Sequence, residues 1–122
     1  MRNIVMITLL IFALPVAVIA HGPAGQNKSD KVEIAPSDVL EKCLKMNPDQ
    51  VLEYSFKASK PMAFNLHYHL IDETVFHVKE EAAERKEVFH PVKEQNVYCM
   101  EWKNSGEDTI TLDYSYSVKE SH

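Results

Sequence analysis

Histidine is the residue type in this sequence best suited to chemistry, and three histidines lie within one short region. His67 and His69 are separated by a single residue, and His77 follows shortly after them. Neutral imidazole is a ligand for Zn²⁺ and Cu²⁺, and histidine titrates at about pH 6.5. Two or three imidazoles held together would therefore form a transition-metal site or a pH-sensitive patch.

A β-strand is predicted to position the first two histidines. Residues 62–70 alternate apolar and polar side chains without a break. This period of two is typical of a half-buried strand, and it places His67 and His69 together on the polar face. A turn over 71–73 would then lead into a second strand over 74–79.

The register of this predicted hairpin brings in the third histidine. Pairing Leu66 with Val78 keeps the apolar residues of both strands on one face, as a sheet with one buried face requires. The same register sets His67 directly opposite His77, with His69 diagonal to it. We therefore expect His67, His69 and His77 to form one cluster that suits copper or zinc.

Two further histidines are weaker candidates as metal ligands. His90 would join the cluster if its strand packs alongside. His21 would carry a free α-amino group if a signal peptide is cleaved after Ala20, and an amine with its own imidazole chelates copper. The alternative is a polar outer face on which histidine is merely tolerated, with no cofactor at all.

The first twenty residues have the pattern of a secretory signal peptide. Arg2 gives a positive start, an apolar run follows from Ile4 to Leu14, and Ala20 ends the segment with a small residue. We expect cleavage after Ala20 and a periplasmic or secreted mature chain. An uncleaved membrane anchor is the alternative, because the apolar run approaches the length of a spanning helix. No later segment is apolar enough to cross a membrane.

The charge of the mature chain excludes several classes of partner. Removing Arg2 from the 13 Lys and Arg leaves 12, against 18 Asp and Glu, so the net charge is −6. Nucleic acids and anionic lipid surfaces are bound by basic patches, so neither is an expected partner. The candidates that remain are another protein or a small ligand.

The two cysteines predict a disulfide. Cys43 and Cys99 both lie after the expected cleavage site, and an even number of cysteines in an exported domain favours a bridge. Two free thiols, or one thiolate that serves as a metal ligand, are the alternatives. If Tyr98, Met100 and Trp102 face the core, Cys99 faces outward, so a bridge would lie on the outer face or reach an edge segment.

The rest of the sequence predicts one antiparallel β-sandwich over residues 32–122, behind a flexible segment over 21–31. Short alternating segments recur about every ten residues and are separated by turn residues, which indicates seven or eight strands. Residues 59–61 are expected to form a turn and 80–87 a charged loop. Residues 37–46 are expected to form either a short helix or, around 41–46, an irregular strand. Aromatic residues supply most of the expected core: Tyr54, Phe56, Phe64, Tyr68, Phe76, Phe89, Tyr98 and Trp102.

The order of these segments resembles that of a GOLD (Golgi dynamics) domain, the lumenal β-sandwich of cargo-sorting proteins. The resemblance implies a jelly-roll-like sandwich. The resemblance covers about three quarters of the mature chain. It rests on Cys43, Tyr54-Ser55-Phe56, the strands over 62–70 and 74–78, Phe89, the run from Val97 to Asn104, and Val118. It implies a bridge between Cys43 and Cys99. The sorting proteins continue into a coiled coil and a membrane anchor, which this sequence lacks after His122, so the resemblance implies a stand-alone exported version.

The sequence favours binding over catalysis. It has only three glycines, no glycine-rich phosphate loop, no nucleophile elbow and no HExxH motif. We therefore expect a non-enzymatic exported binding module. A transition-metal binder that uses the histidine cluster is the alternative.

Overall fold

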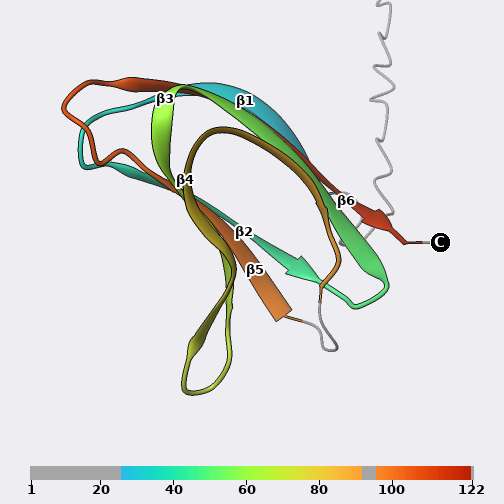
Figure 1. Ribbon diagram of the computed structural model, residues 1–122. Helices are drawn as coiled ribbons and strands as arrows, with labels where there is room; N and C mark the ends of the chain where they lie inside the picture. Colours follow the sequence, from blue (N-terminus) through green and yellow to red (C-terminus); the bar gives the residue numbers. More distant parts are fainter. Residues whose placement is uncertain (1–25, 92–95, 122) are drawn as a thin grey trace, which may run out of the picture.

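The structure is a computed structural model that describes residues 26–91 and 96–121, and these residues form antiparallel β-strands without a helix (Figure 1). No helix that could span a membrane occurs among them. The strands are β1 (Asn27–Ile34), β2 (Val39–Met46), β3 (Gln50–His69), β4 (Thr74–Phe89), β5 (Asn96–Lys103) and β6 (Ile110–Glu120). The predicted all-β antiparallel fold is confirmed.

The long strand β3 belongs to both layers of the sandwich. Its first half, from Gln50 to Ala58, pairs with β6, and its second half, from Ala63 to Tyr68, pairs with β5. Strand β4 follows β3 along both halves, and β1 and β2 add to β6 and β5. The β1 layer is therefore β1-β6-β3-β4, and the β2 layer is β2-β5-β3-β4.

The core lies between the two layers and is centred on aromatic rings. The indole of Trp102, only 1% exposed, lies 5.3 Å from the ring of Phe64, 5.7 Å from Phe56 and 5.4 Å from Tyr114, measured between ring centroids. These rings come from β5, β3 and β6, so they join both layers. The alternation along each strand puts these side chains inward and leaves polar neighbours outside.

The predicted turn at 59–61 and the predicted loop over 80–87 each lie inside one long strand, so the described residues form six strands where seven or eight were expected. The predicted turn at 59–61 is wrong, because β3 runs through it. The pairing of β3 with β4 shifts register between Lys57 and Met62, and this irregularity tolerates Pro61, which has no N–H to donate. A proline in a strand therefore marked a bulge here, not a turn.

Three other predictions change for similar reasons. The expected charged loop over 80–87 is part of β4, an edge strand on which charged side chains remain in water. Of the two alternatives for 37–46, the helix is wrong and the strand is right, although it is a regular strand, β2, that already begins at Val39. The expected flexible segment over 21–31 is wrong for residues 27–31, which pair with β6 as part of β1. The signal peptide and residues 21–25 lie outside the described residues.

Candidate functional site

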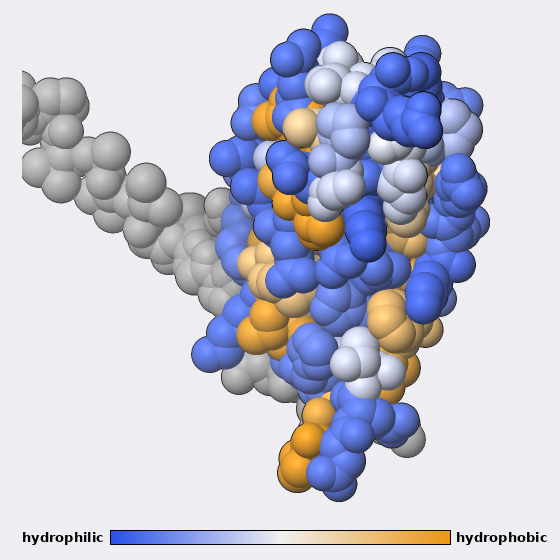
Figure 2. Space-filling model, turned by 90° about the vertical axis from the view of Figure 1, so that its left-hand side faces the viewer, coloured by the Kyte–Doolittle hydropathy of each residue, from blue (hydrophilic) through white to orange (hydrophobic). Residues whose placement is uncertain are grey.

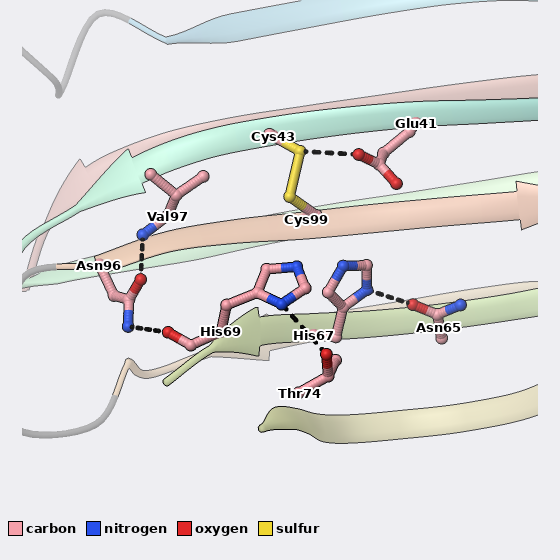
Figure 3. Close-up of a disulfide and its surroundings, with 9 residues drawn as sticks. All are labelled: Glu41, Cys43, Asn65, His67, His69, Thr74, Asn96, Val97 and Cys99. Carbon is pink, nitrogen blue, oxygen red and sulfur yellow. Dashed lines mark hydrogen bonds between the residues drawn. A yellow bond between two sulfur atoms is a disulfide. The ribbon is translucent and has the colours of Figure 1, made fainter. Parts of the chain in front are cut away.

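The outer face of the β2 layer carries a row of four side chains, one from each strand. The register aligns Cys43 of β2 with Cys99 of β5, Cys99 with His67 of β3, and His67 with Phe76 of β4. Figure 3 shows the disulfide and the imidazole of His67 on the same side of this layer, with His69 beside His67. Sulfur and imidazole groups thus gather on one surface.

Cys43 and Cys99 form a disulfide, which confirms the predicted bridge. Because Tyr98, Met100 and Trp102 are buried in the core, Cys99 points outward, and the bridge crosses the outer face to the edge strand β2. The carboxylate of Glu41 lies 3.2 Å from the Cys43 sulfur, and the ligand atoms of these three residues are within 4.8 Å of one another. Both sulfurs are consumed by the disulfide, so this group is not a metal site in the oxidised chain.

His67 and His69 form a pair of adjacent imidazoles. Their ring centroids are 5.1 Å apart. His67 is only 6% exposed, and its Nδ1 lies 2.6 Å from Oδ1 of Asn65, whereas the exposed His69 has its Nδ1 3.0 Å from Oγ1 of Thr74. Each ring is therefore oriented through Nδ1, which leaves Nε2 as the nitrogen that can bind a ligand (Figure 3).

The predicted register that set His67 opposite His77 is wrong. Leu66 does pair with Val78, but His67 pairs with Phe76, so His77 is the extra residue of a β-bulge. The bulge leaves Phe76, an expected core residue, 44% exposed beside His67. The structure therefore brings His67 and His69 together and separates His77 from them.

His77, which is exposed, contacts the other half of β4 instead. Its Nε2 is 3.0 Å from Oε2 of Glu87, and its ring centroid is 4.5 Å from that of the core residue Phe89. The exposed His90 follows directly after β4 and belongs to no group of potential metal ligands among the described residues. His21 lies outside the described residues.

A charged network around His77 was missed by sequence analysis. The carboxylate of Glu87 accepts a 2.7 Å hydrogen bond from the hydroxyl of Tyr54, and Arg85 donates its Nε to the same hydroxyl at 2.8 Å. Arg85 also pairs with Glu80 at 2.9 Å and with Glu87 at 3.2 Å. The network connects the two halves of β4 along the edge of the core. In the sequence, the one sign of this network is that Arg85 and Glu87 are two positions apart, as residues on one face of a strand are. They lie within the charged run over 80–87, which resembles a loop.

Burial and mutual contacts shift the pKa values in this network. Burial raises the pKa of Tyr54 above its usual value, and Glu87 adds to this effect while Arg85 opposes it. Burial opposes the charged form of Arg85, but contacts with Tyr54, Glu87 and Glu80 raise its pKa overall. Burial also raises the pKa of Glu87, but hydrogen bonds from Tyr54 and His77 and the charges of His77 and Arg85 lower it overall. The folded chain thus favours a neutral tyrosine between a charged guanidinium and a charged carboxylate.

We expect Glu87→Gln to lower the free energy of unfolding at pH 7 by about 1 kcal/mol, after solvent screening is allowed for. Because folding lowers the pKa of Glu87, its contribution is complete above the usual value of 4.5 and disappears as the pH falls through the lowered pKa. The difference between the wild type and the variant should therefore shrink in acid. Urea denaturation at a series of pH values measures it.

The matched control is Glu84→Gln, at an exposed position of the same strand that has no ion pair within the described part of the chain. We expect this variant to stay within about 0.5 kcal/mol of the wild type at every pH. An equal loss in both variants, or a Glu87 effect that persists at the lowest pH, would contradict the role assigned to this carboxylate.

A shallow cleft lies on the β1 layer. It has a volume of about 650 Å³ and extends over β1, β6, β3 and β4. Its lining includes Ser29, Ser55 and Ser115, and the hydroxyls of the last two are 3.1 Å apart. The cleft is open to solvent and its hydroxyl groups are partly paired with each other, so it lacks the convergent polar groups of a built ligand pocket.

No protein-family model matches the chain, and no curated protein matches its sequence.

Proposed function

We propose that this chain is an exported binding module without catalytic activity, and that it contacts a partner protein through the end of the β3–β4 hairpin. The observation that carries the proposal is the apolar surface at this end. Ile71 is fully exposed, Leu70 is 46% exposed, and Phe76 on the adjoining strand is 44% exposed. Large apolar side chains grouped at an exposed projection are typical of a contact surface.

The hairpin projects beyond the body of the sandwich. Figure 1 shows the connection between β3 and β4 extending away from the two layers, and Figure 2 shows apolar atoms gathered at the tip of this projection. The backbone N–H of Leu70 donates to the carbonyl of Glu73 at 2.8 Å, which closes the turn. A closed turn presents Leu70 and Ile71 in one fixed arrangement, so little conformational entropy is lost when they are buried.

The chemistry of the tip defines the partner. Asp72 and Glu73 follow Ile71 in the same turn, and both are exposed. The surface that fits is therefore an apolar groove on a protein, bordered by basic side chains. The negative net charge of the chain would add to this attraction over a longer range.

Two other findings support the proposal. A disulfide is compatible with an oxidising compartment, as the expected signal peptide requires. The resemblance to GOLD domains implies a sandwich that binds other molecules, and the disulfide joins the two cysteines for which that resemblance implies a bridge.

A photo-cross-linking amino acid at position 71 tests the proposal. The full chain is expressed with its own leader, and the cross-linker is placed at position 71 or, as a control, at the exposed Glu107 in the β5–β6 loop. We expect the chain in the extracytoplasmic fraction and a specific cross-link from position 71 alone. The captured protein is then purified separately and must bind the purified chain in a titration.

Three outcomes would contradict the proposal. A chain that stays in the cytoplasm would refute export. Cross-links from position 107 but not from position 71 would refute the hairpin as the contact. A captured protein that fails to bind in the titration would show that the cross-link came from a chance encounter.

A further inference from the structure

We propose that Cys43, Cys99, His67 and His69 are the donors of a redox-controlled zinc site. The site is closed while the cysteines form their disulfide, and it takes one Zn²⁺ ion when they are reduced. This inference does not depend on the hairpin or on its partner.

The four donors lie on three adjacent strands and on one face. Cys99 of β5 has Cys43 as its register partner on one side and His67 on the other. Side chains opposite each other on neighbouring antiparallel strands have Cβ atoms roughly 4.5–5.5 Å apart. A metal ion above Cys99 would thus have a donor on each flank, and His69 adds a fourth donor on the same strand as His67 (Figure 3).

Hydrogen bonds decide which nitrogen each imidazole offers. Among the described residues of the oxidised chain, the two cysteine sulfurs and Glu41 are the only group of three or more potential ligands whose atoms lie within 4.8 Å of one another, so the imidazoles must move toward the sulfurs when the bridge is reduced. Asn65 holds Nδ1 of His67 and Thr74 holds Nδ1 of His69. Metal-binding histidines characteristically make such a hydrogen bond through the nitrogen that does not bind the metal. Nε2 of each ring is therefore the nitrogen offered to the ion.

The chemistry of the donor set selects zinc and depends on reduction. Two thiolates and two imidazoles are the donors of many structural zinc sites, in which the ion is tetrahedral. In the oxidised chain the disulfide removes both thiolates and leaves two imidazoles, which is too few for such a site. The nearby carboxylate of Glu41, 3.2 Å from the Cys43 sulfur, adds negative charge that favours a cation.

The reaction balances with a dithiol as the reductant. The dithiol gives two electrons and two protons to the Cys43–Cys99 bond and becomes a disulfide itself, while the S–S bond of the chain becomes two thiols. Zn²⁺ then binds both sulfurs as thiolates, and two protons are released. By linkage, bound zinc must favour the reduced form of the chain to the same degree that reduction favours zinc binding.

Zinc titrations of the oxidised and the reduced chain test the proposal. The chain is reduced with a dithiol, which is removed under anaerobic conditions, and Zn²⁺ is titrated in competition with a chromogenic chelator. We expect one ion per reduced chain, bound about 100-fold more tightly than by the oxidised chain. Co²⁺ in place of Zn²⁺ should give a thiolate-to-metal charge-transfer band in the reduced chain only.

Histidine variants separate this site from zinc held by the cysteines alone. We expect His67→Ala to weaken zinc binding by the reduced chain at least about 10-fold, and the matched control His77→Ala to leave it unchanged. Equal affinities in the two redox states would overturn the proposal. So would a His67→Ala variant that binds zinc as tightly as the wild type.

The reduced chain can be tested for zinc binding whether or not it stays folded without metal. The fluorescence of Trp102, the one tryptophan and a buried residue, reports whether the core is intact. If the reduced chain unfolds without metal, we expect Zn²⁺ to restore the native signal in the wild type but not in His67→Ala. Failure of zinc to restore the wild-type signal would overturn the proposal.

Discussion

Replacing Trp102 by alanine is expected to lower the free energy of unfolding by about 3–5 kcal/mol, as measured by urea denaturation. The indole is 1% exposed and contacts the rings of Phe56, Phe64 and Tyr114, so its removal leaves a large cavity where the two layers meet. Domains of this size are stable by about 5–15 kcal/mol, so the loss would be a large part of the total.

A conservative variant sharpens this prediction. The indole Nε1 of Trp102 is buried without a hydrogen-bond partner among the described residues. Trp102→Phe therefore loses no hydrogen bond and should cost less than Trp102→Ala. Val88→Ala, at a position that is 53% exposed, serves as a control and should cost at most about 0.5 kcal/mol. A Trp102→Ala variant as stable as this control would contradict the position of Trp102 at the centre of the core.

Removing the disulfide is expected to have the second largest effect. The cysteines are 56 positions apart in sequence, and a bridge that closes a loop of this length stabilises the folded state by about 3–4 kcal/mol, chiefly by restricting the unfolded chain. We expect the double variant Cys43→Ser/Cys99→Ser to unfold at a correspondingly lower urea concentration than the oxidised wild type. A chelator in the buffer excludes any contribution from metal ions.

The reduced wild type is the matched comparison for the double variant. Both lack the cross-link, so they should unfold at similar urea concentrations when metal is absent. If the oxidised wild type were no more stable than the reduced wild type or the double variant, the bridge would not stabilise the fold by restricting the unfolded chain.

The sequence predicted the parts of the fold that depend on simple alternation. The strand over 62–70, its turn at 71–73, the outward position of Cys99 and the pairing of Leu66 with Val78 follow from keeping apolar residues on one face. The disulfide followed from the number and context of the cysteines. In each case the signal is local, or it is a choice between two faces of a strand.

Features that depend on irregular pairing were not predicted. The bulge at His77 changes the register by one residue, and no local pattern distinguishes Val-Phe-His-Val with a bulge from the same run without one. The charges of β4 resembled a solvated loop because an edge strand at the rim of a core needs few apolar residues. The network of Tyr54, Arg85 and Glu87 depends on β4 bending along both layers, which is a property of the whole fold.

The bulge also changes which residues the candidate site contains. The predicted register grouped His67 and His69 with His77, whereas the observed pairing separates His77 from them and sets His67 opposite Cys99 of the disulfide. The bulge removes the nitrogen donor of His77, and the pairing of β3 with β5, on the other side of His67, supplies the two sulfur atoms. The metal and the conditions under which the site would bind it change accordingly.

The hairpin end is the central claim of the proposed function, and one affinity measurement tests it most directly. The partner captured from position 71 is titrated with the wild-type chain and with the double variant Leu70→Ser/Ile71→Ser, after circular dichroism confirms that both are folded. Because exposed apolar side chains at the centre of a contact supply much of its free energy, we expect the variant to bind at least about 10-fold more weakly. Equal affinities for a folded variant and the wild type would contradict the claim.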